Sequence, residues 1–275
     1  MAFMVPKPSE KLTERMSAVR YKIAVMSGKG GVGKSTVSVN LARALADSGA
    51  RVGLLDVDIH GPNVPKMLGL DEARFENTER DENGNADIPP IQAGENLFVA
   101  SVGFVGYGEY NALIWRGPMK LGLIKQLLED IAWGELDYMI IDTPPGTGDE
   151  VMTVCQYLPD LDGVVVVSTP QAVAIQDARR TVDFAAKMRA PVVGVVENMR
   201  DPEDGMRMFG SGGAERAAEE LSVPFLGAVP LDARVVPASD GGEPLVSVSP
   251  NDGAGRAMYE IANGVRMAMI ALHES

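Results

Sequence analysis

The feature that most constrains this chain is a glycine-rich turn between an apolar run and a helix-length segment. The run Tyr21–Met26 leads into Gly28-Lys29-Gly30-Gly31-Val32-Gly33-Lys34-Ser35, which fits the pattern G-x-x-x-x-G-K-[ST]. Glycines allow the backbone to bend so that several N–H groups converge on one anion. A helix that starts there adds the positive end of its dipole. The sequence therefore predicts a phosphate-binding loop between a strand and a helix.

Single side chains of this loop predict contacts with MgATP. The Lys34 ammonium is placed to reach the β- and γ-phosphates, and the Ser35 hydroxyl is placed to ligate Mg²⁺. Thr36 is at the position expected to donate to the α-phosphate. The remaining nucleotide contacts are expected from the loop residues Gly28, Gly30, Gly31, Val32 and Gly33. Lys29 adds a second positive charge, which is either a solvated surface lysine or a group that stabilises a transition state in a partner subunit, as an arginine finger does.

Short apolar runs recur along the chain and alternate with helix-length segments. Their near-continuous hydrophobicity indicates strands buried on both faces, as in a parallel sheet. The runs are Val52–Asp56, Leu97–Val102, Tyr138–Asp142, Val164–Ser168, Val192–Glu197 and Phe225–Val229. The helical segments between them are Ser35–Asp47, Lys120–Ala132, Gln171–Met188 and Gly213–Leu221. With the phosphate loop, this alternation predicts an α/β protein, a P-loop NTPase three-layer αβα sandwich with a mostly parallel central sheet.

The domain organisation is expected to be simple. Residues 1–20 form a polar lead-in with a short helix around Glu10–Ala18, and residues 21–275 form a single domain, because no linker composition divides them. The polar stretch Asp71–Asp87 contains the turn signal Asn83–Asn85 and predicts a surface hairpin. The last helix, Arg256–Leu272, has one apolar face, which favours packing on the sheet over a membrane surface because its polar face has only two arginines.

Composition argues against several classes of partner. The formal charge of −13 disfavours general nucleic-acid binding, which needs a basic face. No apolar stretch approaches the roughly 20 residues of a membrane span, and the first residues do not resemble a signal peptide. Cys155 is the single cysteine of the 275 residues, so no intrachain disulfide is possible. We expect a cytoplasmic protein with no nucleic-acid or membrane partner.

Several motifs resemble those of one family of ATPases. The run Ser27–Thr36 is similar to the deviant Walker A loop of the MinD/ParA/nitrogenase-iron-protein class. Further motifs resemble the Mrp/ApbC iron–sulfur carrier ATPases, and together they cover about residues 18–250. They are the switch I-like Asp56–Asn63, the run Trp115–Lys120, the switch II-like Asp142–Asp149, and Glu197–Met199, Gly212–Glu215 and Pro230–Asp232.

The resemblance implies a homodimer with two nucleotides near its interface, in which Lys29 acts on the phosphates of the partner subunit. It also implies that Asp58 orients the attacking water, that Asp142 holds Mg²⁺ through water and that Asn198 contacts the adenine. These roles agree with the chemistry of carboxylates and with the binding of ligands at the carboxyl ends of parallel strands. Asp56 is an alternative to Asp58 in switch I.

The sequence departs from that family at the iron–sulfur site. The usual Cys-x-x-Cys after the Glu-Asn-Met motif is absent, and the chain reads Met199–Phe209 there without a cysteine. Thiolates are the usual ligands of such clusters. Cys155, in the expected helix Glu150–Tyr157, is either an unusual cluster ligand or a buried apolar thiol. Whether this chain holds a cluster is open at this point, and Arg200–Met208 is an alternative site for a partner that holds the metal.

Three functions are compatible with these motifs, and all of them include hydrolysis of ATP to ADP and phosphate. The first is an Mrp/ApbC-type ATPase that assembles or delivers iron–sulfur clusters to an apo client or assembly protein. The second is a MinD/ParA-like positioning ATPase on DNA or membrane. The third is a dedicated maturation partner of one enzyme, without a cluster of its own.

Overall fold

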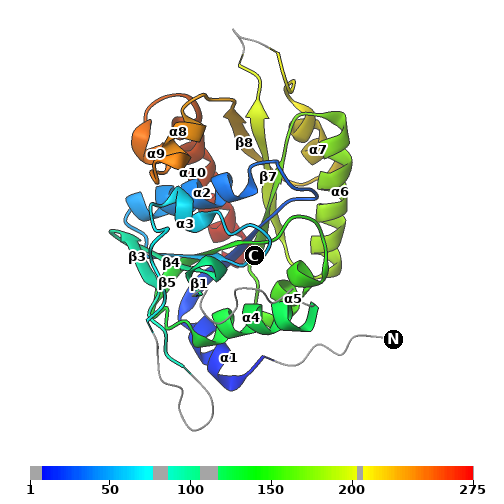
Figure 1. The fold of residues 1–275 in the computed structure, drawn as a ribbon. Helices are drawn as coiled ribbons and strands as arrows, with labels where there is room; N and C mark the ends of the chain where they lie inside the picture. Colours follow the sequence, from blue (N-terminus) through cyan, green and yellow to red (C-terminus); the bar gives the residue numbers. More distant parts are fainter. Residues whose placement is uncertain (1–7, 77–85, 106–116, 203–206, 275) are drawn as a thin grey trace.

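A twisted sheet occupies the centre of the molecule (Figure 1). The computed structural model describes residues 8–76, 86–105, 117–202 and 207–274. Within these ranges the eight-stranded sheet has the order β3-β4-β2-β5-β1-β6-β7-β8, and all neighbours are parallel except β3 and β4. The strands are β1 Val19–Met26, β2 Val52–Asp56, β3 Ile91–Gly94, β4 Leu97–Ser101, β5 Leu136–Asp142, β6 Gly163–Ser168, β7 Val192–Arg200 and β8 Phe225–Pro230.

Helices cover both faces of this sheet (Figure 1). One face carries α2, α3, α8, α9 and α10, and the other carries α1, α4, α5, α6 and α7. The helices are α1 Glu10–Ser17, α2 Lys34–Asp47, α3 Val64–Met67, α4 Gly117–Asp130, α5 Asp149–Tyr157, α6 Ala172–Lys187, α7 Gly213–Leu221, α8 Val235–Asp240, α9 Leu245–Val248 and α10 Gly253–Glu274. The expected three-layer α/β sandwich with a mostly parallel sheet is confirmed.

The central strand β1 shows why the sheet needs helices on both sides. Side chains of a strand alternate between faces. Ile23 and Val25 pack into the core under α2 and α10, whereas Ala24 and Met26 pack into the core under α6 and α7. All four are completely buried, so the run has no polar face. This double burial is the physical reason for the continuous apolar runs in the sequence.

The apolar runs all became strands, with small shifts at their ends, and the elements that the sequence did not reveal are short. β3 has four residues and no completely buried side chain, so it gives no apolar run. The helices α3 and α9 have four residues each, which is too few for a helical period. The expected turn Asn83–Asn85 lies outside the described residues.

The first and the last of the described helices both contribute to the core. In the expected lead-in, Ser9 caps α1 by accepting a hydrogen bond from the Leu12 N–H at 3.1 Å. Leu12 and Met16 of α1 are buried in the core formed with α4 and α5. At the other end, the apolar face of α10 packs against β8 and α2, as expected for a helix that covers the sheet. Among the described residues no helix is long and apolar enough to cross a membrane.

Candidate nucleotide site

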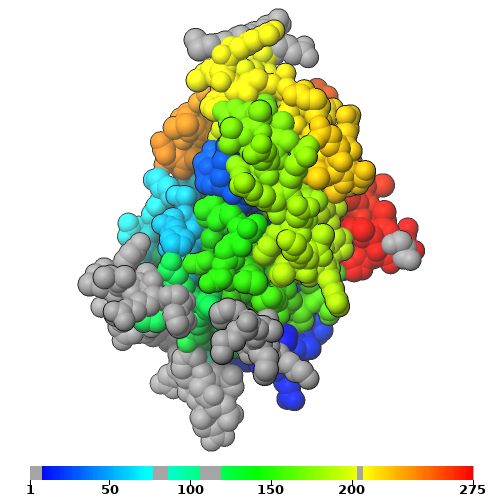
Figure 2. All heavy atoms as spheres, turned by 90° about the vertical axis from the view of Figure 1, so that its right-hand side faces the viewer, coloured from blue at the N-terminus to red at the C-terminus, as the bar shows by residue number. Residues whose placement is uncertain are grey.

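The glycine-rich loop lies at the carboxyl end of β1, near the middle of the sheet. Gly31 and Gly33 have φ angles of 79° and 81°, in the left-handed region that a side chain disfavours. Gly33 is the residue before α2, so the first turn of that helix directs its free N–H groups into the loop. Figure 2 shows the blue atoms of this loop reaching the surface between the orange and green segments. The geometry is that of an anion-binding loop.

Two of the glycines also allow close approach of other elements. A Cβ atom on Gly33 would lie 2.1 Å from the Asn198 amide nitrogen, and one on Gly28 would lie 2.4 Å from the Asp177 carbonyl oxygen. The Asp177 carbonyl oxygen is backbone, so Gly28 has no room for a side chain, and Gly33 is favoured as glycine also by its positive φ angle. The loop is thus packed between the end of β7 and helix α6, which fixes its shape.

The buried carboxylate of Asp142, at the end of β5, is the centre of the polar network. It has no exposed surface and accepts hydrogen bonds from three side chains of α2. Lys34 Nζ lies 2.6 Å from Oδ1, Ser35 Oγ lies 2.6 Å from Oδ2, and Ser38 Oγ lies 2.7 Å from Oδ1. A buried charge is tolerated only when it is paired in this way. The network joins the start of α2 to the end of β5.

Asp56 lies beside Asp142, because the two residues are register partners on the adjacent strands β2 and β5. Asp56 accepts hydrogen bonds from Ser101 Oγ at 2.8 Å and from the Asp58 N–H at 3.0 Å. Complete burial, with a smaller effect of the Asp142 charge, raises the pKa of Asp56 to about 8. The Asp56 carboxyl group therefore holds its proton at neutral pH.

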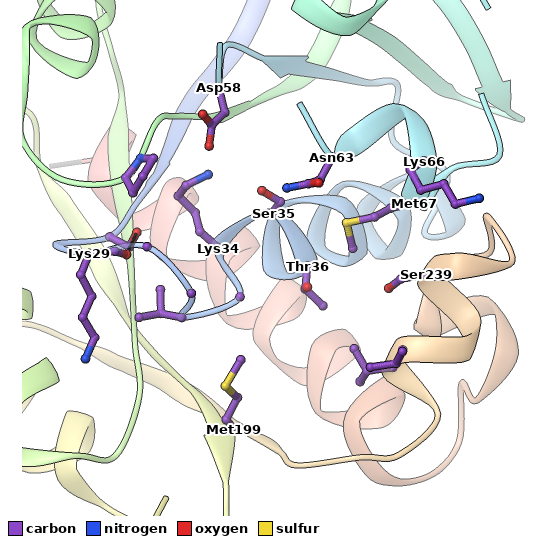
Figure 3. Close-up of a pocket in the computed structure, with 18 of the residues that line it drawn as sticks. Lys29, Lys34, Ser35, Thr36, Asp58, Asn63, Lys66, Met67, Met199 and Ser239 are labelled. Atoms are coloured by element: carbon purple, nitrogen blue, oxygen red, sulfur yellow. Dashed lines mark hydrogen bonds between the residues drawn. The ribbon is translucent and has the colours of Figure 1, made fainter. Parts of the chain in front are cut away.

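Asp58, two residues after β2, faces the loop lysine from the cavity side. Its carboxylate and the Lys34 ammonium point toward one another (Figure 3). Asp58 Oδ1 accepts a hydrogen bond from the His60 N–H at 3.1 Å. Burial raises the pKa of Asp58, and the Lys34 charge acts in the opposite direction. Of the two switch I aspartates, Asp58 lines the cavity, whereas Asp56 is completely buried.

A cavity of about 470 Å³ opens above the loop. Its floor is the run from Lys29 to Thr36, and Asp58 stands at one end. Its other walls come from α3, from Met199 at the end of β7 and from α8, with the residues Asn63, Lys66, Met67, Val235, Val236, Ser239 and Asp240. One end is therefore rich in phosphate-binding groups and the other is partly apolar, as a nucleotide requires.

Three of the expected site residues lie apart from this cavity or turn away from it. The Lys29 side chain points away from Lys34 (Figure 3). Asn198 does not line the cavity, and its amide nitrogen donates to the Val32 carbonyl oxygen at 2.8 Å. Cys155, in α5, lines a separate cavity of about 450 Å³. The other expected residues line the nucleotide cavity, except Gly28, which is packed on α6, and Asp142, which is buried beneath it.

Cys155 has poor surroundings for a metal ligand. Burial raises the pKa of its thiol to about 12, whereas the thiolate is the form that binds metal. Across the ranges that the structure describes, no group of three or more His, Cys, Asp or Glu residues is arranged to hold a metal ion. The side chain of Cys155 is partly buried, with intermediate exposure to solvent.

The Mg²⁺ ion expected with a nucleotide suits the groups that are present. The Ser35 hydroxyl and the Asp142 carboxylate are hard oxygen donors at the phosphate end of the cavity, and they lie within hydrogen-bonding distance of each other. The described lining residues of the cavity include no cysteine and no histidine.

Sequence reasoning missed Ser38 and the α8 wall. Ser38 follows Lys34 by one helical turn, and this i to i+4 spacing on a helix was the signal that would have placed it on Asp142. The α8 residues gave no signal, because the six-residue helix starts after a loop and Ala238 is its single buried residue.

The fold and this site define a P-loop nucleotide-binding protein with MinD/ParA-like architecture. The family model of ParA, described as NUBPL iron-transfer P-loop NTPase, matches residues 18–266. The chain belongs to this family.

Two similar proteins of known name agree with this family assignment. An iron–sulfur cluster carrier protein of Methanococcus maripaludis is 47% identical over 250 residues, which are 89% of this chain and 84% of that protein. A protein of the same name from Methanocaldococcus jannaschii is 46% identical over 248 residues, which are 88% of this chain and 83% of its own length.

Solved structures share the architecture. A nucleotide-binding protein of Archaeoglobus fulgidus in complex with ADP superimposes with a TM-score of 0.70 at 35% identity, over 85% of this chain and 90% of that chain. The septum site-determining protein MinD of Pyrococcus horikoshii, complexed with Mg-ADP, has a TM-score of 0.68 at 24% identity, over 90% and 96% of the two chains. At that identity the MinD likeness supports the fold alone.

The paired aspartates predict a pH dependence of stability. The folded pKa of Asp56 lies above the ordinary value of 3.8, so the folded protein binds more protons than the unfolded chain between about pH 4 and pH 8. The stability contributed by this group is complete below that window and is lost as the pH rises through it. Between pH 5 and pH 8 we expect the wild type to lose about 3 to 4 kcal/mol of stability relative to Asp56→Asn, because one extra bound proton is worth about 1.4 kcal/mol per pH unit.

Urea unfolding at the two pH values measures this difference. Asp183→Asn, on the exposed face of α6, serves as the matched control for removal of a carboxylate. An Asp56→Asn variant with the same pH dependence as the wild type would contradict the protonated state of Asp56.

Proposed function

We propose that this protein is a cytoplasmic MgATP-hydrolysing ATPase that acts in the assembly or transfer of iron–sulfur clusters. The ATPase activity is supported by one observation: Lys34, Ser35 and Ser38 converge on the buried Asp142, directly below a cavity of nucleotide size. The role in iron–sulfur cluster assembly or transfer is supported by the membership of the chain in the iron-transfer family.

The reaction is the transfer of the γ-phosphoryl group of ATP to water. A bond forms between the water oxygen and the γ-phosphorus, the bond from that phosphorus to the β–γ bridging oxygen breaks, and ADP leaves with the bond electrons. Catalysis of this kind rests on positioning and on charge stabilisation. When bound, Mg²⁺ supplies charge neutralisation at the phosphate oxygens.

The residues of the chain have separate tasks in this step. The loop N–H groups and Lys34 hold the phosphates, and Ser35 and Asp142 hold the ion. Asp58 lies at the phosphate end, so its carboxylate orients the water and accepts its proton. Its raised pKa makes Asp58 a better proton acceptor than an ordinary aspartate.

Lys29 acts in the partner subunit of a homodimer. The support for this is its direction, because the side chain leaves its own loop and points away from Lys34 (Figure 3). A lysine so oriented adds no charge at the phosphates of its own subunit. A second copy placed across the cavity mouth brings Lys29 to the other nucleotide, where it stabilises the charge of the transition state.

The nucleotide is an adenine nucleotide. The Archaeoglobus fulgidus relative binds ADP, and the corresponding cavity here has an apolar wall of Met67, Val235 and Val236 against which a base can pack. Ser239 and Asp240 add polar groups at the same end.

The iron–sulfur cluster is cargo that a second protein holds. The two named relatives are cluster carrier proteins, but this chain has one cysteine, and its partly buried thiol has a raised pKa. A homodimer would therefore offer two poorly ionised thiols in place of four thiolates. The chain supplies the nucleotide-driven step, and an apo client or assembly protein supplies the cluster ligands.

A positioning function on DNA or membrane has less support. The apolar face of the last helix, α10, is used to cover the sheet, and its buried residues include Met258, Ile261 and Val265. The chain also carries a formal charge of −13, which opposes the anionic surfaces of both DNA and membranes.

Replacement of the two loop lysines separates binding from hydrolysis. We expect Lys34→Ala to lose MgATP binding, because its ammonium is the charge that faces the phosphates. Lys29→Ala should bind MgATP as the wild type does and should lose hydrolysis by about 10²-fold or more, because its contribution is made in the partner site. Isothermal titration calorimetry and phosphate release measure the two quantities.

Lys187→Ala, an exposed lysine at the end of α6, is the control for loss of a positive charge. Normal turnover of Lys34→Ala would remove the phosphate-loop assignment. Unchanged hydrolysis by Lys29→Ala would remove the role in the partner subunit.

Anaerobic reconstitution with iron and sulfide tests the location of the cluster. We expect well under one iron per dimer, with the same value for Cys155→Ser, because no described thiolate site exists. Metal analysis after gel filtration gives the count. Near-stoichiometric iron that disappears in Cys155→Ser would show instead that the chain carries the cluster itself.

A further inference from the structure

Strand β7 has an irregularity at its end, next to the phosphate loop. Its residue Glu197 pairs with Ala228 of β8, and the next pair is Arg200 with Pro230. Asn198 and Met199 therefore stand opposite the single residue Val229, which is the arrangement of a β-bulge. A bulge turns a side chain out of the regular alternation, and bulges are frequent beside functional sites.

The residue after Asn198 has a strained backbone. Met199 has a φ angle of 61°, in the left-handed region that is unfavourable for residues with a side chain. Such strain persists only where the surroundings enforce it. The result here is that the Met199 side chain lines the nucleotide cavity, while Asn198 is directed underneath the loop (Figure 3 for Met199).

Asn198 contacts the phosphate loop itself. Its amide nitrogen donates to the Val32 carbonyl oxygen at 2.8 Å and lies against Gly33, where a Cβ atom would be 2.1 Å away. The side chain is 6% exposed and is not part of the cavity lining. The two residues are 166 positions apart in the sequence, so this hydrogen bond is a tertiary contact between the end of β7 and the phosphate loop.

The strand end that carries Asn198 is fixed from behind. The completely buried Glu197 carboxylate accepts hydrogen bonds from the Gly212 and Ala214 N–H groups at 2.9 and 2.8 Å, at the start of α7. It also pairs with Arg200 Nε at 2.5 Å. These contacts with α7 and Arg200 fix the position of Glu197. The backbone of the next residue, Asn198, is therefore also fixed relative to the phosphate loop.

We propose that Asn198 is a positioning residue for the phosphate loop, which it holds through the Val32 carbonyl group in the shape that receives the nucleotide phosphates. Its effect on nucleotide binding is therefore independent of the base. The effect of Asn198 on nucleotide binding rests on the proposed function. The contact between Asn198 and Val32 is testable without nucleotide.

Hydrogen exchange of the nucleotide-free protein tests the contact directly. In Asn198→Ala the Val32 carbonyl loses its donor, and we expect the peptide covering residues 27–36 to exchange about fivefold faster, the order of change given by the loss of one buried hydrogen bond. Asn198→Asp keeps the side-chain volume but cannot donate from the same atom, so it should show the same increase even if the alanine variant folds poorly.

Asn40→Ala is the matched control. Asn40 is also a buried asparagine, its amide nitrogen donates to the Thr36 carbonyl at 2.8 Å, and its Oδ1 accepts from the Val246 N–H at 3.0 Å. Its loss should raise exchange around Val246 in α9 more than in residues 28–33. Loop exchange that is unchanged in both Asn198 variants overturns the proposal.

Binding measurements then separate a role in the loop from a contact with the base. We expect Asn198→Ala to weaken MgADP, MgGDP and magnesium pyrophosphate by the same factor, about fivefold or more. Weaker binding of MgADP alone, with pyrophosphate unaffected, overturns the proposal and assigns Asn198 to the adenine. Wild-type protein that binds none of the three would contradict the nucleotide function and would leave the exchange test to decide the role of Asn198.

Discussion

The structure of the site depends on the ion pair between Lys34 and the completely buried Asp142. A carboxylate without access to water is stable only if its oxygens are fully satisfied by donors. The first turns of α2 supply these donors as Lys34, Ser35 and Ser38. The three hydrogen bonds fix the rotation of α2 about its own axis and its position along β5. Because the loop connects β1 to this helix, the same interaction also determines where the loop lies.

Parallel pairing brings the remaining groups to the same place. β2, β5, β1, β6 and β7 run side by side in the same direction, so their carboxyl ends form one edge. Asp56, Asp142 and Asn198 come from three of these ends and surround the loop that follows β1. Complete burial raises the pKa of Asp56 to about 8, so this carboxyl group holds its proton at neutral pH. Residues more than a hundred positions apart thereby form one polar network.

The sequence could predict the elements whose physics is local. The phosphate loop, the doubly buried strands and the long helices follow from glycine placement and hydrophobic period, and the structure has them with small shifts at their ends. The position of Asp58 at the cavity also agrees with the sequence interpretation of switch I.

Other features depend on tertiary contacts that no window of sequence contains. The direction of Asn198 results from a bulge between β7 and β8, and the packing of α1 results from its contact with α4. The cavity wall from α8 is formed by a helix of six residues, which is too short to show a hydrophobic period in the sequence. The absence of a Cys-x-x-Cys was readable from the sequence, whereas the partial burial of Cys155 and its raised pKa depend on the fold.

In the proposed function, Asp142 is the carboxylate through which the protein recognises the metal-bound form of the nucleotide. The most direct measurement is the affinity for ADP with and without Mg²⁺, in the wild type and in Asp142→Asn, by calorimetry at constant ionic strength. The account predicts that Mg²⁺ strengthens ADP binding to the wild type by about tenfold or more, and that Asp142→Asn still binds ADP but loses most of this gain. An Asp142→Asn variant with the full effect of Mg²⁺ would contradict it.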